Sequence, residues 1–303
     1  MAVLQVKNLT KRFGVFTAVD RISFELREGE VLGLLGPNGA GKTTTIQILL
    51  GITTPNSGEI RYFEKDFSQN RQDCLQMINY TSAFNTLQSR TTVWENLLVF
   101  ANLYLIDNPK KKIMELVEYF EIKDLLDSQY KYLSSGEKTR VNFIKALLND
   151  PKIILMDEPT ASLDPDIADK TLSLIEQIKK NKKISILYTS HNMNEIDRIC
   201  DRVIFLSQGK IVAEDTPLNL TKKIETTTLR LTFDKGKKII EKYLIANKQE
   251  FEFSKDNIVI IKTKEKLVPK LIFGISSEGI WMTDIEIQKP TLEDVFLQIS
   301  RNK

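Results

Sequence analysis

The sequence predicts an α/β fold in which a parallel core sheet, an antiparallel β layer and a helical subdomain precede a small α+β domain. Two observations predict the core. An apolar run at 31–35 leads through GPNGAGKT into a helix, and a second run at 153–156 ends in two carboxylates. A third observation, a new series of strands and helices, predicts the second domain. We therefore expect domains at 1–222 and 223–303, with the helical subdomain at about 84–149.

Short strands open the chain. Residues 2–30 and 58–62 contain brief apolar alternations, such as Ile22, Phe24 and Leu26, which indicate strands with one buried face. We expect these strands to form an antiparallel layer beside the core sheet, because their alternation differs from the continuous apolar runs of buried parallel strands.

A phosphate-binding loop follows the first buried strand. Its glycines let successive backbone N–H groups curl toward phosphate oxygens, and a helix is expected from Thr43 to Leu50. Lys42 would supply positive charge to the β- and γ-phosphates, and the Thr43 hydroxyl would bind Mg²⁺. A plain glycine-rich turn is the alternative interpretation. The expected nucleotide-binding residues are Gly36, Pro37, Asn38, Gly39, Ala40, Gly41, Lys42, Thr43 and Thr44.

The helical region holds a second potential phosphate receptor. Thr92 and Glu95 form a capping box before one amphipathic helix, and LSSGE at 133–137 opens another. The free N–H groups and the dipole of such a helix start favour phosphate. Two receptors in one chain predict two chains that share their nucleotides, whereas a merely capped helix is the simpler interpretation. The receptor residues at this second start are Ser134, Ser135, Gly136 and Glu137.

Acidic residues and a histidine follow two later strands. The strand at 153–156 leads to Asp157, which would hold Mg²⁺, and to Glu158, which would polarise the attacking water. The strand at 184–189 leads to His191, the one histidine of the chain. Because carboxyl ends of parallel strands share one sheet edge, His191 is placed to contact a γ-phosphate. Solvated turn acids and an incidental histidine are the alternatives.

The pattern restarts near residues 217–223, after an expected hairpin at 207–210. The segments that follow read as strand, helix, two strands, helix and strand, which is the order of the ferredoxin-like split motif. They are 228–233, 236–248, 251–253, 258–261, 264–274 and 280–287, and a last helix is expected from Leu292.

Composition predicts a soluble cytosolic protein. The net charge of +3 is too small to indicate the basic surface of a nucleic-acid-binding protein, so we expect no nucleic-acid partner. Cys74 and Cys200 have no metal-ligand spacing and are interpreted as reduced bystanders. The N-terminus lacks the apolar core of a signal peptide, and no apolar run approaches the roughly 18 residues of a membrane span.

GPNGAGKTT, LSSGE, ILMDEP, SLD and SH occur in an order that resembles the ATP-binding subunit of an ABC transporter, over about residues 2–222. The resemblance implies an ATPase that binds ATP and Mg²⁺ and uses Lys42, Glu158 and His191 in catalysis. It also implies a head-to-tail homodimer, or a pair of ATPase subunits, in which the phosphate loop of one chain faces LSSGE of the other. Phe13 would stack on adenine. Phe16 is a rival platform, and a core aromatic is the simpler alternative.

The segment PTLEDVFL at 290–297 resembles the ending of ATPase subunits that serve drug, antibiotic and ion exporters. This resemblance implies that the chain powers export through a separate integral-membrane permease. The chain would then be a cytoplasmic protein, held on the inner face of the cell membrane by that permease. A docking or dimer-stabilising role for this segment and a plain capped helix from Thr291 remain alternatives.

Two positions depart from the family pattern. The family's LSGGQ reads LSSGE here, with Ser135 in place of glycine and Glu137 in place of glutamine, and S-x-x-E still forms a capping box. A magnesium-contacting glutamine usually follows a strand like IGYVPQ, but this chain has Ala83 there, and Gln88 lies several residues further on.

Two other classes of function are alternatives to an exporter subunit. A soluble ABC-type ATPase that remodels ribosomes or DNA usually has two cassettes or a long coiled coil. This chain has one phosphate loop and no sustained heptads between 41 and 134. A catalytically silent ATP-binding regulator would be expected to lack part of the catalytic set, which is intact here at Lys42, Asp157, Glu158 and His191.

Overall fold

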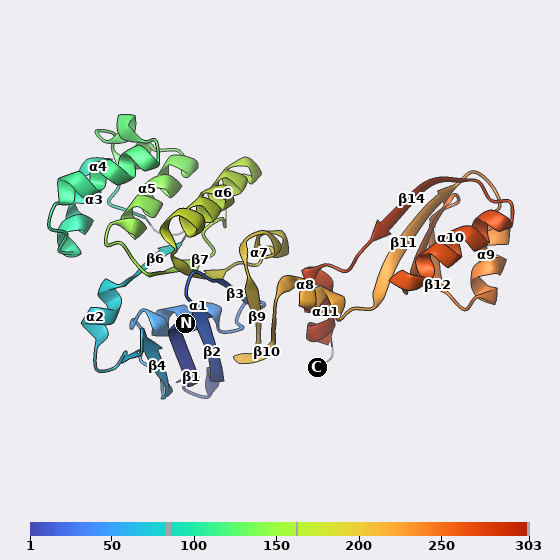
Figure 1. Ribbon diagram of the computed structural model, residues 1–303, viewed down its shortest axis with the longest axis horizontal. Coiled ribbons are helices and arrows are strands. Elements are labelled where there is room, and N and C mark those ends of the chain that lie inside the picture. The colour runs from blue at the N-terminus through green and yellow to red at the C-terminus, as the bar shows by residue number, and fades with distance from the viewer. Residues whose placement is uncertain (83–85, 162, 302–303) are drawn as a thin grey trace. The chain divides into compact units, whose positions relative to one another are not determined.

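The computed structural model describes residues 1–82, 86–161 and 163–301 (Figure 1). The chain divides into two units, Met1–Pro217 and Leu218–Lys303. The division falls at the start of the segment 217–223, where the sequence pattern restarts, and this segment contains the helix α8 (Pro217–Lys222).

A six-stranded sheet forms the centre of the first unit, in the order β10-β9-β3-β8-β7-β6. Strands β9, β3, β8, β7 and β6 are parallel to one another, and β10 pairs antiparallel with β9. The predicted parallel core sheet is thus confirmed. Its strands are β3 (Val31–Leu35), β6 (Ile78–Ser82), β7 (Ile153–Asp157), β8 (Ser185–Thr189), β9 (Arg202–Ser207) and β10 (Lys210–Asp215).

A second sheet is antiparallel throughout, in the order β2-β1-β4-β5. The expectation of short strands was wrong here, because β1 and β2 each span 12 residues. Asn8 and Arg21 have positive φ angles, and the β1–β2 pairing shifts register at several points. These irregularities interrupt the alternation of apolar and polar residues, so each long strand looks like shorter strands in the sequence. The strands are β1 (Ala2–Phe13), β2 (Phe16–Arg27), β4 (Ser57–Tyr62) and β5 (Lys65–Asp66).

A continuous apolar core joins the two sheets around the first helix. Leu4 and Leu26 of the antiparallel sheet share this core with Leu155 of β7 and with Ile46 and Leu49 of the helix, and all five are almost fully buried. The helix that begins at the phosphate-binding loop is therefore fixed between two layers. These are helix α1 (Lys42–Leu49) and, farther along the chain, α2 (Arg71–Gln76), α6 (Pro165–Lys182) and α7 (Met193–Ile199).

Helices α3, α4 and α5 gather at the end of the first unit away from β1 and β2 (Figure 1). The capping box predicted at Thr92 is present: its hydroxyl accepts from the N–H of Glu95, whose carboxylate accepts from the N–H of Thr92. The three helices are α3 (Val93–Leu103), α4 (Pro109–Tyr119) and α5 (Ser135–Leu147).

A partly buried lysine connects helix α5 to the core sheet. The Lys145 ammonium donates to the Asn79 side-chain oxygen and to the Tyr80 carbonyl, both at 3.2 Å, and lies over the Phe100 ring. Burial lowers the pKa of Lys145 from 10.5 to about 8. The folded protein therefore binds this proton less tightly than the unfolded chain does.

We expect this lysine to make stability depend on pH. Between pH 8 and pH 10.5 the unfolded chain keeps the proton that folded Lys145 has lost, so the free energy of unfolding rises with pH. The free energy of unfolding of the wild type, minus that of Lys145→Met, should increase by about 3 kcal/mol between these two pH values. Urea unfolding of both proteins at the two pH values measures the gain, since other titrating groups cancel in the difference. A difference that stays constant with pH would contradict the expectation.

The second unit contains the predicted βαββαβ order. Its antiparallel sheet has the order β12-β13-β11-β14, and α9 and α10 contribute Ile240, Leu244, Leu271 and Ile275 to the core beneath it. The elements are β11 (Thr226–Phe233), α9 (Lys237–Ala246), β12 (Glu250–Lys255), β13 (Ile258–Lys264), α10 (Val268–Ser277), β14 (Met282–Gln288) and α11 (Leu292–Arg301).

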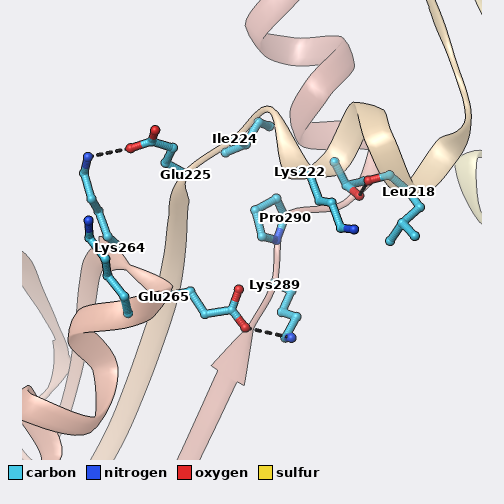
Figure 2. Close-up of a pocket in the computed structure, with 10 residues that line it drawn as sticks. Leu218, Lys222, Ile224, Glu225, Lys264, Glu265, Lys289 and Pro290 are labelled. Atoms are coloured by element: carbon cyan, nitrogen blue, oxygen red, sulfur yellow. Dashed lines mark hydrogen bonds and ion pairs between the residues drawn. The ribbon is translucent and has the colours of Figure 1, made fainter.

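A cavity of about 680 Å³ lies within the second unit (Figure 2). Two ion pairs occupy its wall, Lys264 with Glu225 and Lys289 with Glu265. Both carboxylates that line the cavity are therefore paired with lysines of the same wall.

Candidate functional site

The loop between β3 and α1 has room only for glycine at two positions. Gly41 has a φ of +105°, and a Cβ there would lie 2.4 Å from the Ala18 carbonyl oxygen. A Cβ on Gly36 would lie 2.3 Å from the Leu206 carbonyl oxygen. The Gly209 N–H donates to the Ala40 carbonyl at 3.1 Å, so the β9–β10 turn braces the loop. This close packing holds the loop in a curled conformation.

Lys42 is buried against the loop that precedes it. Its ammonium donates to the Gly36 carbonyl at 2.7 Å and to the Pro37 carbonyl at 3.3 Å. Burial lowers the pKa of Lys42, and the nearby charges of Glu158 and Asp157 act in the opposite direction. The positive charge is thus placed between the loop and the acidic end of β7.

The loop and the start of α1 enclose a cavity of about 190 Å³. Gly41 caps α1 without a side-chain hydrogen bond, so the first N–H groups of this helix remain available to an anion. Curled glycine backbone, a buried ammonium and a helix start together fit a polyphosphate. The cavity is lined by Phe16, Ala18, Asn38, Gly39, Ala40, Gly41, Lys42, Thr43, Thr44 and Glu158.

Asp157 and Thr189 meet across neighbouring strands, where the register of β7 and β8 pairs them. The Thr189 hydroxyl donates to the Asp157 carboxylate at 2.6 Å. Burial raises the pKa of Asp157, and the bond from Thr189, the charge of Lys42 and the Thr43 hydroxyl oppose that rise. The carboxylate and the Thr43 hydroxyl supply hard oxygen donors, which fit Mg²⁺.

Glu158 has a left-handed backbone, with a φ of +49°, a conformation that costs a non-glycine residue about 1–3 kcal/mol. Its N–H donates to the Thr189 carbonyl at 3.1 Å and to the Thr189 hydroxyl at 3.0 Å. The sharp turn directs the Glu158 side chain to the phosphate-loop cavity. The nearest oxygen of its carboxylate lies 3.2 Å from Nδ1 of the exposed His191. The structure therefore brings together Lys42, Asp157, Glu158 and His191 as predicted.

The second helix start is also formed as predicted. Ser134 caps α5, its hydroxyl accepting from the Glu137 N–H, and the Glu137 carboxylate accepts from the Ser134 N–H at 2.7 Å. These bonds with Ser134 lower the pKa of Glu137. Ser134, Gly136 and Glu137 line a different cavity, of about 590 Å³ beside α6, and not the phosphate-loop cavity. The two receptors of one chain therefore face separate spaces.

Comparison with known proteins agrees with this geometry. Residues 19–161 match the ABC transporter family. The chain is 30% identical to the linearmycin resistance ATP-binding protein LnrL of Bacillus subtilis, over 98% of both chains. It is also 30% identical to the bacitracin transport ATP-binding protein BcrA of Bacillus licheniformis, over 98% of this chain and 97% of that protein.

The chain belongs to the ABC transporter family. It is an ATP-binding subunit with ATPase activity, and such subunits work with a membrane permease. Its fold resembles that of CbiO1 from Clostridium perfringens, part of an ABC transporter complex, with a TM-score of 0.66 at 25% identity over 80% of this chain and 95% of that one. None of the helices in the described ranges is both long enough and apolar enough to cross a membrane.

Two aromatic residues flank the hairpin turn between β1 and β2. Phe13 and Phe16 pair in register, and both are half-exposed or more. Phe16 lines the phosphate-loop cavity, whereas the Phe13 ring lies under the ammonium of Lys11 at 4.9 Å. The rival platform named from the sequence is thus the one at the cavity wall in this structure.

Ala83 and Gln88 are the two residues that bear on the missing loop glutamine. Ala83 lies outside the described residues. The Gln88 side-chain oxygen accepts from the N–H of the adjacent Ser89 at 3.0 Å, and the Gln88 backbone bonds to Asn96. Gln88 is therefore engaged within its own loop.

The sequence patterns do not identify several residues that support the site. Thr189 bonds to both acids, Ala18 packs against the phosphate loop, and Gly209 braces it. Thr189 alone had a sequence signal, because it ends the strand that leads to His191.

Proposed function

We propose that this chain is the ATP-hydrolysing subunit of an exporter and that it forms an ATP-sandwich homodimer on the cytoplasmic face of a membrane permease. The main support for the sandwich is that the two phosphate receptors of one chain open to separate cavities. The relatives that extend along nearly all of this chain, the second unit included, are named for antibiotic resistance and antibiotic transport. Export of an antibiotic-like compound follows from that likeness.

Within this proposal, each site residue has a role that its surroundings support. Lys42 and the loop N–H groups hold the phosphates, and Thr43 with Asp157 would hold Mg²⁺, which neutralises phosphate charge when bound. Glu158 orients the attacking water and accepts its proton. His191, whose ring lies beside the Glu158 carboxylate, contacts the γ-phosphate. The hairpin that carries Phe13 and Phe16 provides the platform for adenine.

We also infer that residues 1–217 bind nucleotide without help from the second unit, because every cavity residue of the phosphate loop lies in the first unit. The second unit would then serve association, either with the permease or with the paired subunit.

Affinity purification from membranes tests this proposed function. The tagged chain should recover an untagged integral-membrane protein in near-equal amount, and ATP turnover should rise when both are placed in liposomes. A tagged 1–217 variant should bind ATP within about a few-fold of the full chain and recover less of the membrane protein. Recovery of ribosomes or nucleic acid in place of a membrane protein would contradict the proposal.

A further inference from the structure

A buried carboxylate behind the catalytic edge has no role in the mechanism above. Glu195 of α7 is buried, with 6% of its surface exposed. One of its oxygens accepts three hydroxyls and the other accepts one side-chain amide. The donors are Thr160 at 2.7 Å, Tyr188 at 2.9 Å, Ser190 at 2.9 Å and the Asn192 amide at 3.3 Å.

The four donors that the structure describes around Glu195 are all neutral. Burial, and next the charge of Glu195, raise the pKa of Tyr188, so that this hydroxyl keeps its proton and donates it. A buried carboxylate is costly unless it is well hydrogen-bonded, and bonds to a charged acceptor are the stronger kind. Such an arrangement joins its donors firmly to one point.

The donors come from the two segments that carry the catalytic groups. Thr160 lies two residues after Glu158 and is itself buried. The turn between them is closed by the Ala161 N–H, which donates to the Glu158 carbonyl at 3.1 Å. Ser190 directly precedes His191, and its hydroxyl also accepts from the N–H of Asn192 at 3.0 Å. One carboxylate oxygen is thus bonded to both segments.

We propose that Glu195 is a positioning residue that holds the turn of Glu158 and the segment of His191 at a set separation. The inference rests on the proposed roles of Glu158 and His191. Without the bond to Thr160, the left-handed turn at Glu158 keeps its bonds to Thr189 but loses its connection to the Glu195 carboxylate. Without the bond to Ser190, the segment that carries His191 loses its hydroxyl bond to the Glu195 carboxylate. Small displacements of catalytic groups lower the rate of chemistry more than they lower substrate binding.

Three conservative variants test this inference. Glu195→Gln keeps the shape but removes the charge, Thr160→Val removes one donor, and Ser190→Ala removes the other. We expect each to lower kcat by about 10- to 100-fold and to leave KM for ATP within about 2-fold. Asp197→Asn is the matched control, because Asp197 is an exposed acid on the same helix, and its kcat should equal that of the wild type.

A double-mutant comparison separates positioning from general loss of structure. If Glu195 acts through Glu158 and His191, adding Glu195→Gln to the double variant Glu158→Gln/His191→Ala should change single-turnover hydrolysis by less than about 3-fold. An equal fall in both backgrounds, or wild-type kcat in all three variants, would overturn the inference. Wild-type turnover in Glu158→Gln would instead reject the proposed catalytic role, so the two failures are distinguishable. If Glu195→Gln does not fold, the Thr160 and Ser190 variants decide.

Discussion

Replacing Glu158 by glutamine is expected to lower ATP hydrolysis by about 10²–10⁴-fold, which corresponds to about 2.7–5.4 kcal/mol of barrier. The substitution keeps the length of the side chain and removes its capacity to accept a proton from water. ATP affinity should remain within a few-fold, since Lys42 and the loop N–H groups hold the phosphates. Phosphate release and nucleotide affinity, measured on one preparation, check both expectations.

Two further substitutions serve as comparisons for this result. His191→Ala should also lose turnover while ADP affinity stays nearly constant, because ADP lacks the phosphate that His191 would contact. Lys42→Ala should weaken ATP binding itself, because its buried ammonium lies between the loop and the acids. Full turnover in Glu158→Gln, in protein free of contaminating ATPase, would remove Glu158 from its proposed role.

ATP is expected to drive dimerisation of the Glu158→Gln variant, and Ser134→Arg is expected to abolish the dimer. In the proposed sandwich, the γ-phosphate of one chain's nucleotide reaches the exposed start of α5 in the other. Arginine at Ser134 removes the capping hydroxyl and fills the space before the helix N–H groups. Analytical ultracentrifugation with ATP, with ADP and without nucleotide measures the effect, and ADP should leave the protein monomeric.

The Thr92→Arg substitution is the matched control for this prediction. Thr92 caps α3 with the same type of capping box, so its loss costs a similar helix cap. This variant should still dimerise with ATP, because we assign no nucleotide contact to the start of α3. The shared-nucleotide arrangement would be rejected if Glu158→Gln stayed monomeric at every ATP concentration while the wild-type chain hydrolysed ATP at its full rate.

The predictable part of the fold came from local patterns. The apolar run of β3, the glycine loop and the helix that follows are adjacent in the chain, and each has strong backbone requirements. The βαββαβ order of the second unit was predictable because each of its strands and helices has its own local sequence pattern. The strands β1 and β2 were underestimated, because positive φ at Asn8 and Arg21 interrupts the period that identifies a strand.

The candidate site was predictable where chemistry is concentrated in a motif. The sequence alone predicted four residues of the site, because each follows a strand that ends at the same sheet edge. They are Lys42, Asp157, Glu158 and His191. The sequence by itself also determined the helix start at Ser134, since a capping box needs only residues three apart.

Only the tertiary structure decided which distant groups support these residues. The bond from Thr189 to Asp157 depends on the register of β7 with β8, and Glu195 reaches Thr160 across 35 positions of the chain. It also placed Phe16, and not Phe13, at the phosphate-loop cavity. Local patterns determine backbone conformation over a few residues, whereas these contacts form only when packing brings together segments that are far apart in the chain. No short-range pattern encodes which of those segments become neighbours.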